Sequence, residues 1–219
     1  MGKEHTIIVI GRSFGAGGKS IGKVLSEKLG IPIYDNTLLN ESAKEFGFSR
    51  DIFCRVDEKR PSRFKRFVTQ SYGVQESYIY DAISNETLYQ AQSRVIRAIA
   101  ERGPCIIVGR TSDYVLRDFP GLVSVFVHAP LAYRAQKIVE RGDATTPEEA
   151  IELAKRKDKS REKYYNYFTG RYWGVASNYD LCLDSSLLPV GDSAEVIAGF
   201  VRRLEAANRS FGEKIEKNF

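Results

Sequence analysis

The chain has 219 residues, of which 42% are hydrophobic, and carries a net charge of +5. This length can bury one substantial α/β core, so we expect a single domain. The positive charge suits an anionic ligand, but it is too small for a chain of this length to indicate nucleic acid. Apolar runs are too short to span a membrane, and the N-terminus lacks the apolar stretch of a signal peptide. We therefore expect a cytoplasmic protein with no membrane partner.

The cysteines and histidines of the chain show no pattern typical of disulfide, metal or nucleophilic chemistry. The three cysteines, Cys54, Cys105 and Cys182, are far apart and show no C-x-x-C spacing. This pattern indicates neither a disulfide framework nor a zinc site. The two histidines, His5 and His128, are also too separated to form a nucleophilic or metal-binding group.

The first element is an apolar run over residues 6–10, followed by a glycine-rich turn and a segment with helical spacing. Strand, glycine turn and helix in this order are typical of a phosphate-binding loop. Glycines let backbone N–H groups converge on phosphate oxygens, and the positive end of the next helix faces the same anion. Lys19 would add a charge for the β and γ oxygens, and the Ser20 hydroxyl would bind Mg²⁺. The residues expected to hold the phosphates of a nucleotide, the phosphate donor, are Gly15, Ala16, Gly17, Gly18, Lys19 and Ser20.

The spacing of this loop departs from the P-loop pattern G-x-x-x-x-G-K-[ST]. When the pattern is anchored on Gly18 and Lys19, Ser13 stands where the first glycine belongs, and Gly11 comes two residues too early. A strand-to-helix turn that binds nothing is the alternative. The strand and helix on either side favour phosphate binding.

The elements that follow alternate between helices and strands. A helix is expected from residue 21 to Gly30, a short strand over 31–34 ends at Asp35, and Asn85 can cap a helix that ends at Gly103. Two buried strands are then expected, over 105–108 and 122–127, because short continuous apolar runs fit a parallel sheet that is covered on both faces.

The last third continues the alternation. Pro130 opens a helix at its first position and Gly142 closes it. A capping box at Thr146 begins a long helix toward Gly170. A last strand is expected over 179–184, and Asp192 can cap a final helix. This alternation predicts an α/β fold, a parallel sheet with helices on both faces.

Residues 36–84 fit the alternation poorly. They combine basic residues with aromatic ones, for example Arg63 beside Phe64 and Arg66 beside Phe67. A solvated helix with buried aromatics is the simplest interpretation. A nucleic-acid patch is less favoured because no recognition module accompanies it. A third interpretation is an insertion that closes over a phosphate-bearing acceptor.

Three stretches resemble the cytidylate kinase-like family of P-loop nucleoside monophosphate kinases. They are Ile8-x-x-Gly11-Arg12-x-Phe14-Gly15-x-Gly17-Gly18-Lys19, Gly30-Ile31-Pro32-Ile33-Tyr34-Asp35 and Ile107-Val108-Gly109-Arg110-x-x-Asp113-Tyr114-Val115-Leu116. Later stretches agree, including Asp158-x-x-Arg161, Thr169-Gly170-x-x-Trp173 and Tyr179-Asp180-Leu181-x-Leu183-Asp184. The resemblance implies a single P-loop kinase domain. Its core would be residues 1–35, 85–145 and 176–219, with a helical acceptor-binding insertion over about 36–84 and a lid over about 146–175.

The acceptor side is expected at the carboxyl ends of the strands. Cytidylate kinases carry an Asp-Gly-Arg-Asp segment that helps to bind the acceptor, and Val108-Gly109-Arg110-Thr111 occupies that place here, without either acidic residue. Arg110 could grip the acceptor's phosphate with two hydrogen bonds, or form a surface ion pair with Asp113. Asp35 could orient the acceptor, hold Mg²⁺ through water, or cap a helix. The substrate-binding candidates are Asp35, Arg110 and Asp113.

Six cations crowd the long helix: Lys155, Arg156, Lys157, Lys159, Arg161 and Lys163. Neighbouring cations repel one another, so we expect an anion as their partner. A lid that brings cations onto the phosphoryl group during transfer would have this pattern. Arg161, because of the Asp158-x-x-Arg161 spacing, is expected to reach the phosphates. Lys19, Arg110 and Arg161 are therefore the catalytic candidates.

The sequence predicts an ATP- and Mg²⁺-dependent kinase that acts on a small phosphate-bearing acceptor, a nucleoside monophosphate such as CMP. No apolar run ends in a Walker-B carboxylate near the middle of the chain, so Mg²⁺ is expected on Ser20, the nucleotide and waters. A kinase for another metabolite is one alternative. A catalytically weak nucleotide-binding module with a regulatory or nucleic-acid partner is the other. The sequence does not define the oligomeric state.

Overall fold

The computed structural model describes residues 5–35, 75–109 and 111–207. Cys54, most of the expected insertion over 36–84, and Arg110 lie outside the described residues. The predictions made for them therefore remain predictions.

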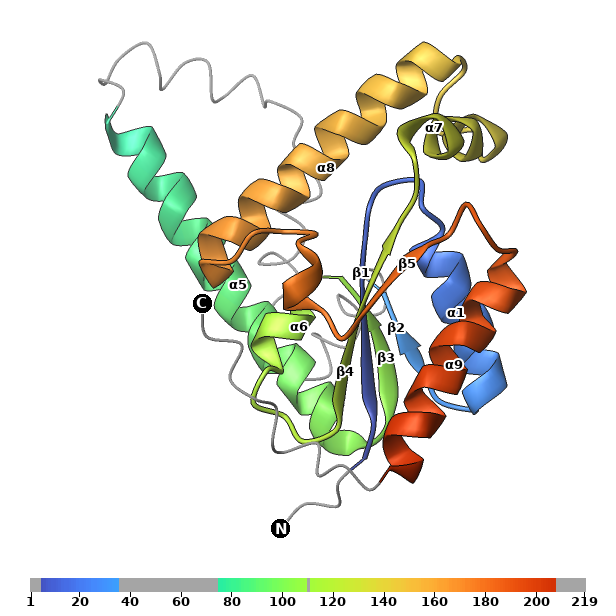
Figure 1. The fold of residues 1–219 in the computed structure, drawn as a ribbon. Coiled ribbons are helices and arrows are strands. Elements are labelled where there is room, and N and C mark those ends of the chain that lie inside the picture. Colours follow the sequence, from blue (N-terminus) through green and yellow to red (C-terminus); the bar gives the residue numbers. More distant parts are fainter. Residues whose placement is uncertain (1–4, 36–74, 110, 208–219) are drawn as a thin grey trace.

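A five-stranded parallel sheet forms the centre of the molecule (Figure 1). Its spatial order is β2-β3-β1-β4-β5, so the first strand of the chain lies in the middle. Ile8 of this strand pairs with Ile106 on one side and Val123 on the other. The strands are β1 (Ile7–Arg12), β2 (Ile33–Tyr34), β3 (Cys105–Val108), β4 (Leu122–His128) and β5 (Leu181–Asp184).

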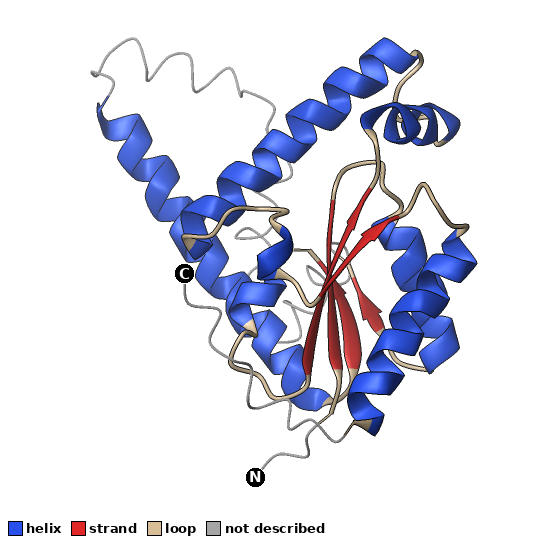
Figure 2. Cartoon of the chain, viewed as in Figure 1, coloured by secondary structure: helices blue, strands red, loops and turns tan. Residues whose placement is uncertain are grey.

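Helices cover both faces of the sheet (Figures 1 and 2). One face packs against α1 (Gly18–Leu29) and α9 (Val190–Ala206), and the other against α5 (Gln75–Arg102) and α6 (Ser112–Val115). Ile8 belongs to the core under α1 and α9, whereas Ile7 and Val9 belong to the core under α5. This alternation follows from the two-residue period of a strand, and it confirms the predicted doubly covered parallel sheet.

Two more helices lie beyond the carboxyl ends of the strands. They are α7 (Leu131–Glu140) and α8 (Pro147–Thr169), which share a small core and cross above the sheet (Figure 1). The Thr146 side chain caps α8 by accepting the N–H of Glu149, and Gly170 ends the helix in the left-handed conformation. The predicted capping box and C-terminal glycine therefore set these bounds. A short 3₁₀ helix (Ala176–Asn178) leads from α8 back to β5.

Several predicted element bounds were wrong. The strands expected over 31–34 and 179–184 begin at Ile33 and Leu181, and the helix expected from residue 21 begins at Gly18. Asn85 does not cap a helix but lies inside α5, because apolar residues continue at helical spacing upstream of it to Tyr78. Asp192 lies in the first turn of α9, whose cap is Pro189, although its charge still faces the positive end of the helix. Similarly, Pro130 is the cap of α7 rather than its first residue.

The expectation of no membrane partner was based on short apolar runs. Within the described residues, no helix is long and apolar enough to cross a membrane.

Candidate active site

The glycine-rich loop joins the middle strand to the N-terminus of α1. The Ser13 N–H donates to the Val127 carbonyl over 3.0 Å, which ties the start of the loop to the end of β4. Gly15 and Gly17 have φ angles of 84° and 75°, a region that residues with a Cβ rarely enter. The loop therefore leads into α1 at Gly18, where the first N–H groups of the helix are at the end of the loop. In other proteins this arrangement binds anions.

The turn after β5 fixes the loop from the other side. The Ser185 hydroxyl donates to the Ala16 carbonyl over 2.7 Å, and the Ser185 N–H donates to the His128 carbonyl. Leu187, two residues later, is 76% exposed. An exposed leucine thus lies in the turn that supports the glycine-rich loop.

Lys19 and Asp35 meet at the carboxyl edge of the sheet. The Lys19 Nζ lies 2.6 Å from Asp35 Oδ2, and the lysine side chain is 58% exposed whereas that of the aspartate is 15% exposed. The ion pair connects the first turn of α1 with the end of β2. Ser20 follows in the same helical turn and is exposed.

Helix α8 is held on the loop by a carboxylate. Asp158 Oδ1 accepts the Phe14 N–H over 2.7 Å, and Asp158 Oδ2 accepts from Arg134 Nη1 of α7 over 2.6 Å. Arg134 Nη1 also donates to the Phe14 carbonyl over 3.0 Å. Both polar groups of the Phe14 backbone are thereby bound by the same salt bridge, which links the loop, α7 and α8.

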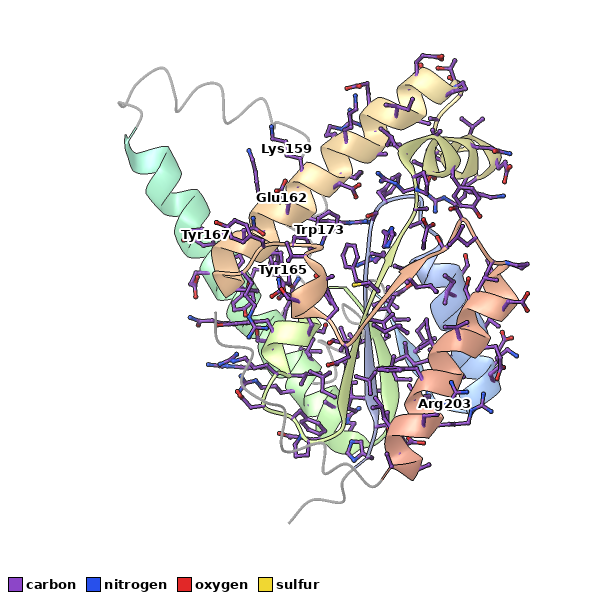
Figure 3. The ribbon with its side chains drawn as sticks, viewed as in Figure 1. Lys159, Glu162, Tyr165, Tyr167, Trp173 and Arg203 are labelled. Carbon is purple, nitrogen blue, oxygen red and sulfur yellow. The ribbon has the colours of Figure 1, made fainter. Side chains whose placement is uncertain are left out.

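Arg161 is the cation of the α8 run that reaches the loop. Its Nη1 donates to the Arg12 carbonyl over 3.0 Å, and its guanidinium lies 5.4 Å from the centre of the Phe14 ring. Burial lowers the pKa of the guanidinium, which Asp158 partly offsets. The other five cations of the run are exposed, and Lys159 lies along α8 on the side away from the sheet (Figure 3).

The turn after β3 has an unusual backbone. Gly109 has a φ of 83°, and the buried Thr111 has a φ of 54°. A β-branched residue in the left-handed region is strained, and such strain is found most often at functional sites. The Ser112 hydroxyl donates to the Gly109 carbonyl over 2.5 Å and stabilises the turn. Arg110, which these two residues flank in the sequence, lies outside the described residues.

Asp113 holds the far end of α8 against α6. Its Oδ2 accepts from the Tyr165 hydroxyl over 2.7 Å. Burial raises the pKa of the Asp113 carboxyl, whereas the Tyr165 hydroxyl and Arg171 act in the opposite direction. Beside it, the Tyr179 hydroxyl accepts the Gly174 N–H, and Phe126 contacts both Tyr179 and Trp173. Tyr165 and Trp173 are both labelled at this end of α8 in Figure 3.

Comparison with known proteins gives the family. The sequence model of the "Cytidylate kinase-like family" matches residues 7–187, which is most of the chain. This chain belongs to the cytidylate kinase-like family. A cytidylate kinase of Pyrococcus horikoshii is 23% identical over 187 residues, which cover 85% of this chain and 83% of the relative.

Solved structures agree on the fold of this family member. An uncharacterized protein from Eubacterium ventriosum is similar with a TM-score of 0.68 and 25% identity, over 90% of this chain and 99% of the other. A gluconokinase from Sinorhizobium meliloti has a TM-score of 0.50 at 15% identity, over 94% of this chain and 99% of the other. The P-loop kinase fold expected from the sequence is therefore confirmed.

Sequence reasoning brought together some site residues and missed others. Lys19 and Asp35 meet, Arg161 reaches the base of the loop, and Asp113 bonds to a tyrosine of α8. The contributions of Arg134 and Ser185 were not foreseen. Neither residue carries a local signal, because each acts on a loop more than 100 residues away in the sequence. The sequence also predicted no role for Arg12, whose carbonyl accepts from Arg161.

Proposed function

We propose that this member of the cytidylate kinase-like family transfers the γ-phosphoryl group of ATP to a nucleoside monophosphate such as CMP. The observation that carries the proposal is the delivery of Arg161 from α8 to the base of a glycine loop that opens a helix. Phosphoryl transfer needs positioning and charge neutralisation more than covalent help from the protein. A loop for the phosphates and a lid cation beside it would supply both.

The donor's phosphates would lie on the loop from Gly15 to Ser20. The exposed Lys19 would exchange Asp35 for the β and γ oxygens, since a half-exposed ion pair contributes little and is readily replaced. The exposed Leu187 would pack against the adenine ring, because its turn is bonded to the loop through Ser185.

The residues near Lys19 fit a magnesium ion. The Ser20 hydroxyl and the Asp35 carboxylate supply the oxygen ligands that Mg²⁺ prefers, directly or through water. When bound, the ion would offset the negative charge of the nucleotide's phosphates. Among the described residues no group of three or more histidine, cysteine or acidic side chains could hold a metal ion, so most of the ligands would be phosphate oxygens and waters.

In the proposed step, an oxygen of the acceptor's phosphate forms a bond to the γ-phosphorus. The bond from that phosphorus to the β,γ-bridging oxygen breaks at the same time, and the bridging oxygen leaves with ADP. Arg161 would stabilise the charge on the moving group, while α8 excludes water from it.

The acceptor would bind at the carboxyl ends of β2 and β3. We assign Arg110 to the acceptor's phosphate and Asp35 to its orientation, and Asp113 would act by holding α8 over the site. Residues 36–84 would form the acceptor-binding insertion and residues 146–175 the lid, around the core of the single domain. The insertion's boundary then falls within α5, which begins at Gln75.

The experiment is an ADP-formation assay with ATP, Mg²⁺ and a panel of nucleoside monophosphates. We expect turnover with at least one pyrimidine monophosphate. The loss of both acidic residues around Gly109 and Arg110 favours a second candidate, a kinase for another phosphorylated metabolite. ADP formation with such metabolites but with no nucleoside monophosphate would support it. ATP binding without turnover on any acceptor would instead support a nucleotide-binding module and overturn the proposal.

A further inference from the structure

Arg12 lies between the two halves of the proposed site. It is the last residue of β1, the middle strand, and it directly precedes the phosphate loop. On one side of β1 lies β3, whose carboxyl end leads into the turn at Gly109. A side chain that starts from Arg12 can therefore reach from the donor loop to the acceptor side.

Two glycines show the path of this side chain. A Cβ added to Gly18 would lie 2.8 Å from Arg12 Cβ and 3.1 Å from Cγ, so the stem of the arginine passes the first residue of α1. A Cβ added to Gly109 would overlap Arg12 Nη1. The guanidinium thus lies directly against the backbone of the β3 turn, one residue before Arg110.

The backbone of Arg12 is fixed by the lid. Its carbonyl accepts from Arg161 Nη1 over 3.0 Å, while the strand pairs it with Val127. The side chain thus leaves a fixed backbone, passes Gly18 and ends against the turn at Gly109, which preorganises the guanidinium. Such preorganisation is what stabilises charge in a transition state.

We propose that the Arg12 guanidinium binds the phosphoryl group in transit between donor and acceptor. The inference rests on the proposed function, since it needs a donor on the loop and an acceptor at the β3 turn. The guanidinium would donate hydrogen bonds to the equatorial oxygens of the moving group and would form no covalent bond. The bonds made and broken are those of the proposed step, with ADP as the leaving group.

A purely structural role is the competing explanation. Arg12 could support the Gly109 turn without touching a ligand, because a guanidinium against a backbone also stabilises a loop. The two roles differ in what they affect: a support would change the stability of the ligand-free protein, and a ligand to the moving phosphoryl would change the affinity for a mimic of that group.

The test uses Arg12→Met and Arg12→Lys in the full chain, with Arg203→Met as the matched control. Arg203 is an exposed arginine on α9 near the opposite end of the molecule from α8 (Figure 3). The probes are ATP with Mg²⁺, and ADP with Mg²⁺ and aluminium fluoride, which mimics the phosphoryl group in transit and needs no known acceptor. Calorimetric titration gives each affinity, and thermal unfolding of the ligand-free proteins shows whether each variant folds.

We expect aluminium fluoride to tighten ADP binding to the wild type and to the Arg203→Met control. Arg12→Met should lose about tenfold to hundredfold of this tightening, the size of one charge-assisted contact, while its affinity for ATP changes by less than about threefold. Arg12→Lys should recover only part of the loss, because the ammonium lacks the planar pair of donors.

Three results would overturn the inference. The first is equal weakening of ATP and of the fluoride complex, which would make Arg12 a donor-site residue. The second is an Arg12→Met protein that keeps the full tightening by aluminium fluoride, whether or not it loses thermal stability. Arg12 would then be a structural support. The third is a wild type that binds ATP but whose binding of ADP is not tightened by aluminium fluoride.

The same measurements separate this inference from the proposed function. A wild type that binds no ATP overturns both. A wild type that phosphorylates no nucleoside monophosphate but shows Arg12-dependent tightening overturns only the choice of acceptor.

Discussion

At the scale of single residues, we expect Lys19 to contribute to ligand binding far more than to the fold. Its ammonium pairs with Asp35 but is 58% exposed, so the pair adds little to stability. We expect Lys19→Ala to keep nearly the same unfolding temperature without ligand and to lose most of the rise in that temperature that ATP produces. A ligand that binds only the folded state stabilises it by mass action, and a weaker ligand does so less.

The matched control for Lys19 is Lys28→Ala. Lys28 lies on the same helix and pairs with Glu195 on the surface. This variant should keep the full ATP-induced rise. Thermal unfolding at several ATP concentrations measures both, and an unchanged rise in Lys19→Ala would remove the lysine from the donor site.

Arg110 tests the acceptor side alone. Arg110→Lys keeps the charge but loses the planar pair of donors, so acceptor KM should rise and kcat/KM should fall by about tenfold to hundredfold. ATP affinity should hardly change. Steady-state kinetics beside ATP titration checks this, with the exposed Arg117→Lys as control. A change in ATP affinity without a change in KM would place Arg110 on the donor side.

Asp113 makes the stability of the protein depend on pH. Burial raises the pKa of its carboxyl above the ordinary value of 3.8, with Tyr165, Tyr179 and Arg171 as its titratable and charged neighbours. The folded state therefore holds this proton more tightly than the unfolded state, and its contribution to stability is complete below pH 3.8 and is lost as pH rises through the folded pKa. We expect the free energy of unfolding of Asp113→Asn, relative to that of the wild type, to be higher at pH 7 than at pH 4.

Urea unfolding of both proteins across this range measures the difference. The exposed Asp118→Asn is the control, and its difference from wild type should not change in the same direction. If the difference for Asp113→Asn stays constant with pH, the carboxyl does not titrate with a raised pKa.

At the scale of elements, Asp158 joins α8 to the glycine-rich loop. Asp158→Asn leaves one oxygen for two donors, so either the Phe14 N–H or the Arg134 guanidinium loses its bond to residue 158. We expect a loss of about 1–3 kcal/mol in the free energy of unfolding, the cost of a charged hydrogen bond with an unsatisfied partner. ATP affinity should fall as well, because the loop is less fixed.

The control on the same helix is Glu152→Gln, whose carboxylate pairs with Lys155 on the exposed face. Its effect should stay within about 0.5 kcal/mol, the usual range for an exposed pair. Urea unfolding and ATP titration are the measurements. Similar effects of the two variants would mean that Asp158 does not hold the loop.

At the scale of the whole molecule, stability depends on the middle strand, which is buried on both faces. Ile8→Ala should lower the free energy of unfolding by about 2–5 kcal/mol, the cost of a cavity in a tightly packed core. Val196→Ala, at a residue of α9 that is 41% exposed, should cost much less. Urea unfolding compares them, and equal losses would contradict a core centred on β1.

Much of this architecture could be predicted from the sequence. Apolar runs, glycine stops and the capping box at Thr146 act locally, so they predicted the order of strands and helices and the loop between β1 and α1. The C-terminal ends of parallel strands meet at one edge, which is why Lys19 and Asp35 could be expected to be neighbours.

Contacts that depend on how helices cross could not be predicted. The bond from Phe14 to Asp158 joins residues 144 positions apart and needs the particular angle of α8 over the loop. Thr111 is a second case, since its left-handed conformation opposes the preference of a β-branched residue and only the surrounding turn imposes it.

The path of the Arg12 side chain links three positions that would otherwise vary independently in evolution. Any side chain at position 109 would occupy the space of the guanidinium, and one at position 18 would collide with its stem. Relatives that carry a larger residue at position 18 should therefore have lost the arginine, and those that carry one at position 109 should have lost it or turned its guanidinium away. Positions 12, 18 and 109, which lie at two different loops, should therefore covary across the family.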